Sequence, residues 1–365
     1  MNANPQPVSS QESRSLRILQ VGIGSWGSSW LEIIEASNGW ELAGVVSRTP
    51  EHAAEVGALH GVPAFRDIQE AVRFSKENPG AIDAVLVATP PEHHAAIAIE
   101  ALRAGLDVLI EKPLAPTIAD AESIIRASED FGRIAMVAQN YRFKRAPRTV
   151  QRLIRDGVIG DIQQVFVTFQ KNPPFVGFRL EMDEPLIVDG MAHQLDQIRG
   201  VLGLQPTALR ARSWNPSWSQ FSGNASVSLD IECSGGARVL YTASWASYGP
   251  QTSWDGDWDI QGTKGGIHWS NNTVTITFSS LFDSVFLAGA VEKSGIMHVT
   301  LDDLPAEERL GALAEFHRAI MQSDTPETDV RDNIASLQLV LATLESAQKD
   351  GSPVRLELPH LVPST

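Results

Sequence analysis

A glycine-rich turn near the start of the chain constrains the fold most. The apolar run 16–21 leads into Gly22, Gly24 and Gly27, spaced G-x-G-x-x-G, and a helical pattern with apolar residues follows. In a strand–turn–helix context the first glycine permits the tight turn, the second lets the backbone approach a pyrophosphate, and the third lets the helix pack on the strand. The turn therefore predicts a dinucleotide-binding domain; the alternative is a chance glycine-rich turn.

Short apolar segments alternate with helical patterns through the rest of the first 140 residues. This alternation predicts a doubly wound parallel sheet of the Rossmann type, covered by helices on both faces and binding its ligand beyond the carboxyl ends of the strands. The segment 89–92 has the pattern of a capping box that opens a helix at His93. The further expected strands lie at 40–47, 83–88, 107–110 and 134–138, and an expected helix lies at 117–131.

The residues that select between the two nicotinamide cofactors are expected at Ser47 and Arg48. In this fingerprint an acidic residue about 20 positions after the glycines binds the ribose 2′-hydroxyl of NAD. At that distance from Gly27 the chain carries a hydroxyl and a guanidinium, and both groups suit a 2′-phosphate. The sequence therefore favours NADP over NAD. The alternative is that Arg48 is a solvated charge at the start of a helix.

The segment Glu111-Lys112-Pro113 is the second chemical signal. It follows the expected strand 107–110, and the proline ends that strand. Lys112 is thus expected at the carboxyl edge of the sheet, where the nicotinamide of a bound cofactor would lie. The alternative for this lysine is an ordinary surface position in a turn.

The second half of the chain has short β-rich segments between turns. Strand patterns are expected at 162–170, 207–213, 225–232, 238–244, 258–261, 266–269 and 273–278, and helices at 144–156, 306–322 and 330–349. A length of 365 residues fits two domains. We expect a tail over 1–15, an NAD(P)-binding domain over 16–140, and a substrate-binding and oligomerisation domain of the α+β class over 141–365.

The segment 189–196 is expected to open an amphipathic helix that runs to residue 202. Asp189, His193 and Asp196 are spaced i, i+4, i+7, which places them on one face of such a helix. A histidine held near a carboxylate can move a proton near neutral pH. The alternative is a solvated helix face.

These motifs, in this order and with the segment 88–94, resemble the Gfo/Idh/MocA oxidoreductases, the relatives of glucose–fructose oxidoreductase and inositol dehydrogenase. The resemblance extends from residue 16 to residue 358 and implies a second domain built on a large, open, mostly antiparallel sheet. It implies catalytic roles for Lys112, Asp189 and His193, with His193 moving the hydroxyl proton. It implies cofactor contacts from Gly22, Gly24, Ser25, Trp26, Gly27, Ser47, Arg48, Thr89, Pro90, His94, Glu111, Lys112, Gln139 and Asn140.

The stretch Gln139–Arg142 follows the last strand of the first domain. In the family it lies under the nicotinamide, so the resemblance implies that Asn140 and Arg142 bind substrate together with Lys112, Asp189 and His193. A structured linker is the alternative for this stretch. No metal ligand set is expected, because the nine histidines and the single cysteine show no metal-ligand spacing.

Nine tryptophans are present, six of them in the second half of the chain. Because sugar rings stack on aromatic faces, the segment 214–218, with a tryptophan at each end, is a candidate border of a sugar pocket. For any one tryptophan, a place in the core or at a packed face is the preferred interpretation.

Charge and composition exclude several classes of protein. The net charge of −15 disfavours a nucleic-acid partner. One cysteine allows no internal disulfide, so a reducing cytoplasm is the expected compartment. No apolar run is long enough to predict a membrane span, and residues 1–15 lack the apolar centre of a signal peptide.

The expected function is hydride transfer between a nicotinamide and a secondary alcohol or ketone of a sugar, a sugar derivative or an inositol-like polyol. Three alternatives stay open: transient oxidation by a tightly held NAD during glycoside cleavage or epimerisation, a non-enzymatic dinucleotide sensor, and a reductase of a tetrapyrrole or an imine. The family also implies a homodimer or homotetramer assembled through the second sheet, since open sheet faces need a partner.

Overall fold

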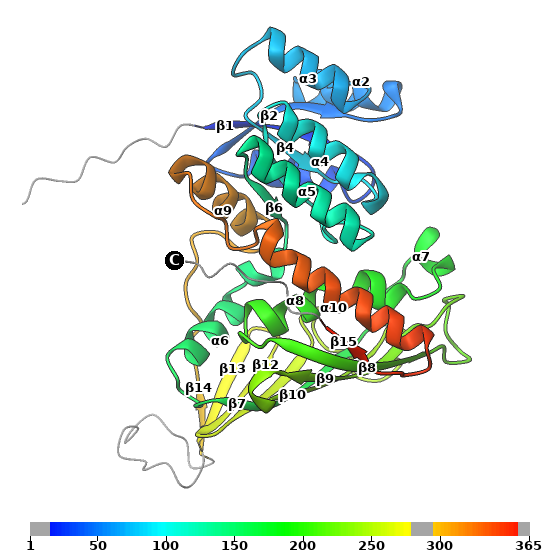
Figure 1. Cartoon of the computed structure of the whole chain (residues 1–365), viewed down its shortest axis with the longest axis vertical. Coiled ribbons are helices and arrows are strands. Elements are labelled where there is room, and N and C mark those ends of the chain that lie inside the picture. Colours follow the sequence, from blue (N-terminus) through cyan, green and yellow to red (C-terminus); the bar gives the residue numbers. More distant parts are fainter. Residues whose placement is uncertain (1–14, 279–294, 357–365) are drawn as a thin grey trace, which may run out of the picture.

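The computed structural model of the chain contains two sheets stacked one above the other, with helices between them (Figure 1). It describes residues 15–278 and 295–356. Nearly all of the expected tail, 1–14, lies outside the described residues, and so does 357–365 at the other end of the chain.

The first sheet is the expected Rossmann sheet, with six parallel strands in the order β3-β2-β1-β4-β5-β6. Strand order reverses between β1 and β4, which is where such sheets bind ligands. The strands are β1 (Leu16–Val21), β2 (Trp40–Val46), β3 (Ala64–Phe65), β4 (Ala84–Val87), β5 (Asp107–Ile110) and β6 (Ala135–Val137). The helices are α1 (Ser28–Glu35), α2 (Pro50–His60), α3 (Ile68–Glu77), α4 (His94–Arg103) and α5 (Ile118–Phe131).

The helix starts show which local sequence signals the fold uses. The side chains of Asp67 and Thr117 accept backbone N–H groups and cap α3 and α5. The prediction of a capping box at 89–92 is wrong. Residues 91–93 form a 3₁₀ turn, α4 begins one residue later, and the Thr89 hydroxyl caps no N–H group.

The second sheet has nine strands in the order β14-β13-β12-β11-β7-β10-β9-β8-β15, and among these described strands only β7 and β10 pair in parallel. The expected mostly antiparallel sheet is thus confirmed. The strands are β7 (Ile162–Gln170), β8 (Pro206–Trp214), β9 (Ser226–Cys233), β10 (Arg238–Ser244), β11 (Asp257–Gly262), β12 (Gly265–Ser270), β13 (Thr273–Phe278), β14 (Ile296–His298) and β15 (Val354–Arg355). Its helices are α6 (Arg145–Arg155), α7 (Phe178–Glu181), α8 (Ala192–Gly200), α9 (Glu308–Gln322) and α10 (Val330–Gln348).

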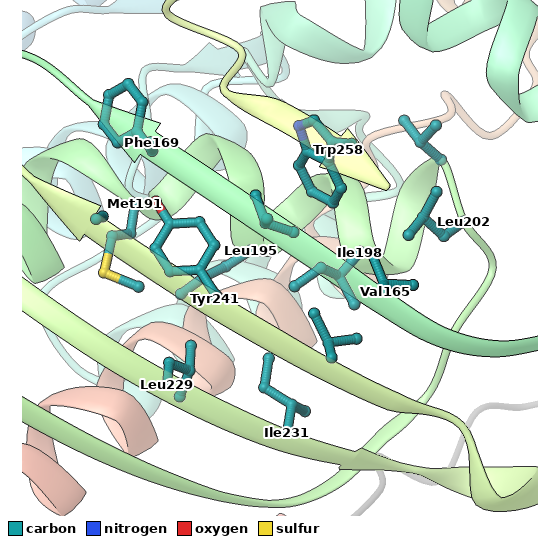
Figure 2. Close-up of a cluster of buried hydrophobic side chains, with 14 of the residues drawn as sticks. Val165, Phe169, Met191, Leu195, Ile198, Leu202, Leu229, Ile231, Tyr241 and Trp258 are labelled. Carbon is teal, nitrogen blue, oxygen red and sulfur yellow. The ribbon is translucent and has the colours of Figure 1, made fainter. Parts of the chain in front are cut away.

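Helix α8 packs its apolar side onto this sheet. Figure 2 shows Met191, Leu195, Ile198 and Leu202, from α8 and its flanks, over apolar side chains of the strands. Four tryptophans are fully buried, Trp30 in the first domain and Trp245, Trp258 and Trp269 in the second. The contact of α8 with the second sheet fixes the position of this helix, which carries His193.

The two C-terminal helices reach back to the first domain (Figure 1). Phe316 of α9 stacks on Trp40 with ring centroids 5.3 Å apart, and the Trp40 indole donates to the Leu313 carbonyl at 2.9 Å. Val330 and Ile334 of α10 belong to the core on the other face of the first sheet. The boundary near residue 140 stays a prediction, and the core of the first domain includes chain from beyond residue 300.

Candidate active site

The glycine turn leaves an open cradle between β1 and α1. Gly22 has a φ of 95°, and a Cβ there would lie 2.6 Å from the Ala88 carbonyl oxygen. A Cβ at Gly27 would collide with the Gly22 carbonyl, whereas one at Gly24 would meet nothing within 4 Å. Gly24, Ser25 and Trp26 are exposed. The first and third glycines therefore allow close packing, and the second leaves open space of the kind a pyrophosphate occupies.

Glu111 joins the glycine turn to the lysine segment. Its Oε1 accepts the indole N–H groups of Trp26 at 2.9 Å and Trp30 at 2.7 Å, and its Oε2 accepts the Lys112 amide at 3.0 Å. The carboxylate is buried and fully used by these donors. This geometry supports a structural role for Glu111 in place of the direct cofactor contact expected from the resemblance.

Three buried polar atoms of the predicted site residues have no partner within the described residues. They are Thr89 Oγ1 after β4, Gln139 Oε1 after β6, and His193 Nδ1. Buried polar groups are normally hydrogen-bonded, so such atoms point to a polar ligand. Together with the open space at Gly24, they fit a dinucleotide along this edge, with the nicotinamide end near Lys112.

Two other expected cofactor residues differ in their surroundings. His94 is fully buried, and its ring nitrogens contact the carbonyl oxygens of Pro113 at 3.0 Å and Thr89 at 2.8 Å. Its contacts support the backbone on either side of the site, so the expected direct cofactor contact is not supported. Pro90, by contrast, is exposed at the carboxyl end of β4.

Ser47 and Arg48 follow β2, at the edge where the adenosine ribose of a Rossmann ligand lies. Arg48 is exposed, and the described residues give its guanidinium no ion pair. The Ser47 hydroxyl accepts the Thr49 amide at 3.2 Å. No carboxylate is present among residues 47–50.

Lys112 is part of a charged cluster with Asp189 and Arg179. The Lys112 ammonium donates to Asp189 Oδ1 at 2.8 Å and to the Asp189 carbonyl at 3.2 Å, and Arg179 Nε donates to Asp189 Oδ2 at 2.6 Å. The Lys112 side chain is only 13 % exposed, so the surface-turn alternative is wrong. Burial alone would raise the pKa of Asp189, but Lys112 and Arg179 outweigh burial and hold it well below its ordinary value.

The backbone between Asp189 and His193 differs from the expected continuous helix. Residues 186–190 form a π-helical turn, and α8 begins only at Ala192. Gly190 lies in this turn against Trp245, and a Cβ there would be 2.5 Å from the indole. The turn changes the phase of the helix, so the i, i+4, i+7 argument does not hold through Asp196.

His193 lies face to face with Tyr141. The two ring centroids are 3.9 Å apart and the planes differ by 5°. Burial and the nearby Lys112 ammonium lower the pKa of His193 well below 6.5; Asp189 opposes this shift and Lys144 adds to it. The imidazole is therefore neutral at pH 7, with one ring nitrogen free to accept a proton.

Tyr141 and Lys144 belong to the site but were not expected as functional residues. The Lys144 ammonium lies 4.4 Å from the Tyr141 centroid and is 2.7 Å from Asp255 and 3.7 Å from Glu308. Arg179 was also missed. Only the position of Tyr141 between Asn140 and Arg142 could have suggested a role. The acidic partners of Lys144 are distant in sequence, and no motif marks the contact of Arg179 with Asp189.

The expected substrate residue Arg142 is buried and fully occupied. Its guanidinium donates to both oxygens of Asp196, at 2.7 and 2.6 Å, and to Asp332 at 2.9 Å. Asp196 is only 1 % exposed, which excludes the solvated helix face for this residue. These contacts correct the expectation that Arg142 binds substrate and the expectation that Asp196 shares a helix face with Asp189 and His193. Arg142 and Asp196 instead fix α8 against the start of the second domain. Asn140, the other expected residue of this stretch, is half-buried in the turn before them.

Trp214 and Trp218 line a hollow of about 620 Å³ together with Tyr248, Thr242 and Ser244. The Thr242 and Ser244 side chains alternate along β10 with Tyr241 and Ala243, which are buried in the core beneath α8. The hollow therefore opens on the outer face of the sheet, and these tryptophans do not border the Lys112 cluster.

Two family descriptions match successive parts of the chain. Residues 16–139 match "Oxidoreductase family, NAD-binding Rossmann fold", and residues 147–268 match "GFO/IDH/MocA C-terminal domain". The chain belongs to the Gfo/Idh/MocA oxidoreductase family. Members of this family among its relatives are named dehydrogenases and reductases, and this member is likewise an oxidoreductase with an NAD-binding Rossmann domain.

Curated relatives of this Gfo/Idh/MocA protein cover most of its length. A 1,5-anhydro-D-fructose reductase from Ensifer adhaerens is 26% identical over 90% of this chain and 95% of the relative. An inositol 2-dehydrogenase from Arthrobacter sp. is 28% identical over 75% of this chain and 83% of the relative. The solved inositol dehydrogenase homolog from Azotobacter vinelandii, complexed with NADH and myo-inositol, has a TM-score of 0.78 at 19% identity over 95% and 99% of the two chains, and shares the fold.

Over 15–278 and 295–356, no helix is long and apolar enough to cross a membrane. Over the same ranges, no three histidine, cysteine or acidic side chains gather in a way that suits a metal ion.

Proposed function

We propose that this protein transfers a hydride between NADP and a secondary alcohol or ketone carbon of a sugar, a sugar derivative or an inositol-like polyol. The observation that carries the proposal is the contact of Lys112 with Asp189 beside a neutral, half-buried His193, at the nicotinamide end of the Rossmann sheet. When bound, the nicotinamide supplies the hydride chemistry, and the protein supplies position and proton transfer.

His193 acts as the acid–base group. In the oxidative direction the substrate hydroxyl gives its proton to the free ring nitrogen as its carbon loses hydride, so alcohol and oxidised cofactor become ketone, reduced cofactor and a proton. The lowered pKa keeps the imidazole neutral before the step. The parallel Tyr141 ring prevents the imidazole from turning out of its plane.

Lys112 stabilises the substrate oxygen. An ammonium has three donors, and two of them contact Asp189. The third is available to an oxygen on which negative charge develops. Asp189 acts by fixing Lys112, and Asn140 remains a proposed substrate contact.

The decisive experiment replaces His193 with asparagine. We expect His193→Asn to lower kcat by about 10²–10⁴-fold, the range of acid–base catalysis, and to leave the dissociation constant of NADPH unchanged. Turnover at the unaltered rate would contradict the assigned role. A screen of sugars and polyols at the nicotinamide absorbance also separates net oxidation from transient oxidation by a retained cofactor, in which absorbance does not accumulate.

The preference for NADP rests on Ser47 and Arg48. The Arg48 guanidinium is exposed and has no ion pair within the described residues, which suits a 2′-phosphate, and residues 47–50 carry no carboxylate to bind a 2′-hydroxyl. We expect Arg48→Ala to raise the KM for NADP at least tenfold and to leave the KM for NAD nearly constant. A wild-type enzyme with a large preference for NAD would refute this choice.

We propose a homo-oligomer formed through the outer face of the second sheet, and a cytoplasmic location on the basis of the single buried, unpaired Cys233. Phe166 and Leu240 lie opposite each other on neighbouring strands of that face, 39 % and 43 % exposed. Contiguous exposed apolar surface marks interaction sites, and we propose that this pair contributes to such a surface. The sensor alternative is disfavoured by the intact set of Lys112, Asp189 and His193.

A further inference from the structure

Arg179 is held rigidly at the edge of the active site. Its guanidinium carbon lies 5.1 Å from the Phe175 ring centroid and 5.0 Å from that of Phe178. Phe175 in turn packs edge-on against the buried Trp245 at 5.0 Å. With Nε bonded to Asp189, the arginine is anchored at its base and on its faces, so it pays little entropy to bind a ligand.

The outer half of this guanidinium is unused by the protein. Within residues 15–278 and 295–356, Nη1 and Nη2 of Arg179 have no hydrogen-bond acceptor, although the side chain is only 29 % exposed. These two nitrogens carry four N–H donors in a planar fork. Such a fork matches the two oxygens of a carboxylate.

The charge around Asp189 also leaves room for an anion. Two cations, Lys112 and Arg179, contact this one carboxylate, which balances only one of them. Glu111, the next carboxylate along the chain from Lys112, is bonded to two indoles and a backbone amide, so its oxygens are directed away from Arg179. The Nη fork of Arg179 is therefore open to an outside anion, and its planar geometry fits the two oxygens of one carboxylate.

We propose that Arg179 binds a carboxylate of the substrate, so that the preferred substrates are sugar acids, polyhydroxylated chains or rings with one carboxylate. This inference rests on the function proposed above and narrows its substrate class. Lys112 and His193 serve the hydroxyl that reacts, and Arg179 fixes the carboxylate end and so selects which hydroxyl faces them.

The test compares three six-carbon compounds that carry a carboxylate, no charge or a phosphate. D-Gluconate, sorbitol and D-glucose 6-phosphate are assayed with NADP and NAD on the full chain, and each is also titrated by calorimetry into the enzyme–NADPH complex. We expect D-gluconate to bind at least 30-fold more tightly than sorbitol, and Arg179→Gln to remove that difference while sorbitol binding changes less than threefold. Arg179→Lys should keep part of the preference, and Arg103→Gln, at a surface ion pair on α4, should keep all of it.

The outcomes separate the two proposals. Equal loss of gluconate and sorbitol binding in Arg179→Gln would mean that the arginine only supports Asp189. Tightest binding of the phosphate compound would mean that the fork binds a phosphate. Either result overturns the proposal that Arg179 binds a substrate carboxylate. Carboxylate-selective binding without any cofactor reduction would leave the Arg179 site standing and overturn hydride transfer.

Discussion

The phenol ring of Tyr141 lies parallel to the imidazole of His193, with centroids 3.9 Å apart and planes 5° from parallel. The Tyr141 ring also has the Lys144 ammonium 4.4 Å from its centroid. This arrangement screens the imidazole from water and places a second positive charge near it. Tyr141 thus helps to set the protonation state of His193 without providing a proton itself, since burial raises the pKa of its hydroxyl.

Removing the ring should change the pH dependence of the reaction. In Tyr141→Ala, water reaches the imidazole and its pKa rises toward 6.5, so the acid limb of the kcat–pH profile moves up. Tyr141→Phe keeps the stack and should keep the wild-type profile. If both variants lost activity with unaltered pH profiles, the ring stack would contribute to packing and not to the pKa of His193.

The same histidine should make folding sensitive to mild acid. The unfolded chain binds a proton at His193 near pH 6.5, whereas the folded imidazole stays neutral there, so lowering the pH favours unfolding. We expect the free energy of unfolding to fall by up to about 1.4 kcal/mol for each pH unit between 6.5 and 5 from this residue. Urea unfolding measured at several pH values should show that the free energy of unfolding depends less on pH in His193→Asn than in the wild type. Asp189 acts in a separate window, because its stabilising charge is lost only as the pH falls below 3.8.

The two glycines of the cofactor turn should separate binding from folding. Gly24→Ala adds a methyl group in open space, so we expect an unchanged melting temperature and an NADPH dissociation constant raised at least tenfold. Gly27→Ala would press a methyl group against the Gly22 carbonyl and should lower the melting temperature. Undiminished NADPH binding by Gly24→Ala would place the pyrophosphate elsewhere.

The buried pair of Arg142 and Asp196 should contribute strongly to stability. Asp196→Ala leaves the guanidinium with Asp332 as its remaining carboxylate and a long contact to the Glu327 carbonyl, and breaking such a pair costs about 3 kcal/mol of unfolding free energy. The double variant Arg142→Met, Asp196→Leu removes the unpaired charge and should regain part of the loss, as urea unfolding would show. A loss that grew in the double variant would mean that the charges themselves are required.

The outer sheet face should control assembly. Leu240→Lys places a charge beside Phe166, and light scattering on a size-exclusion column should show a smaller particle than the wild type. Leu59→Lys is the matched control, because Leu59 is 79 % exposed on α2, away from that face. A wild-type protein that runs as a monomer would contradict the proposed contact.

Local patterns were sufficient to predict the longer strands, whereas the short strands β3, β14 and β15 were not predicted. The periodicity of these patterns gave β7, β10 and β13 with the bounds found in the structure, and the glycine turn predicted the first sheet. Helix phase was not predictable at Asp196, because the π-helical turn at 186–190 is stabilised by packing against Trp245, 55 residues away from Gly190 in the sequence.

The partners in the ion pairs could not be predicted from the sequence either. Arg142 looked like a substrate residue because its neighbours in sequence lie at the site, whereas its partners Asp196 and Asp332 lie 54 and 190 residues away. The Arg179 contact to Asp189 spans only ten residues, but Arg179 lies in the short helix α7 and Asp189 in the π-helical turn, and no regular periodicity connects the two.

The stacking of Phe316 on Trp40 has a consequence for biosynthesis. Because α9 supplies Ala312, Leu313 and Phe316 to the same core as Trp40, a nascent chain that has emerged only through β14 lacks part of the cover of its first sheet. The second domain is also incomplete at that point, since residues of α10 lie in its core and β15 pairs with β8. We therefore expect neither domain to complete its packing until almost the whole polypeptide has left the ribosome.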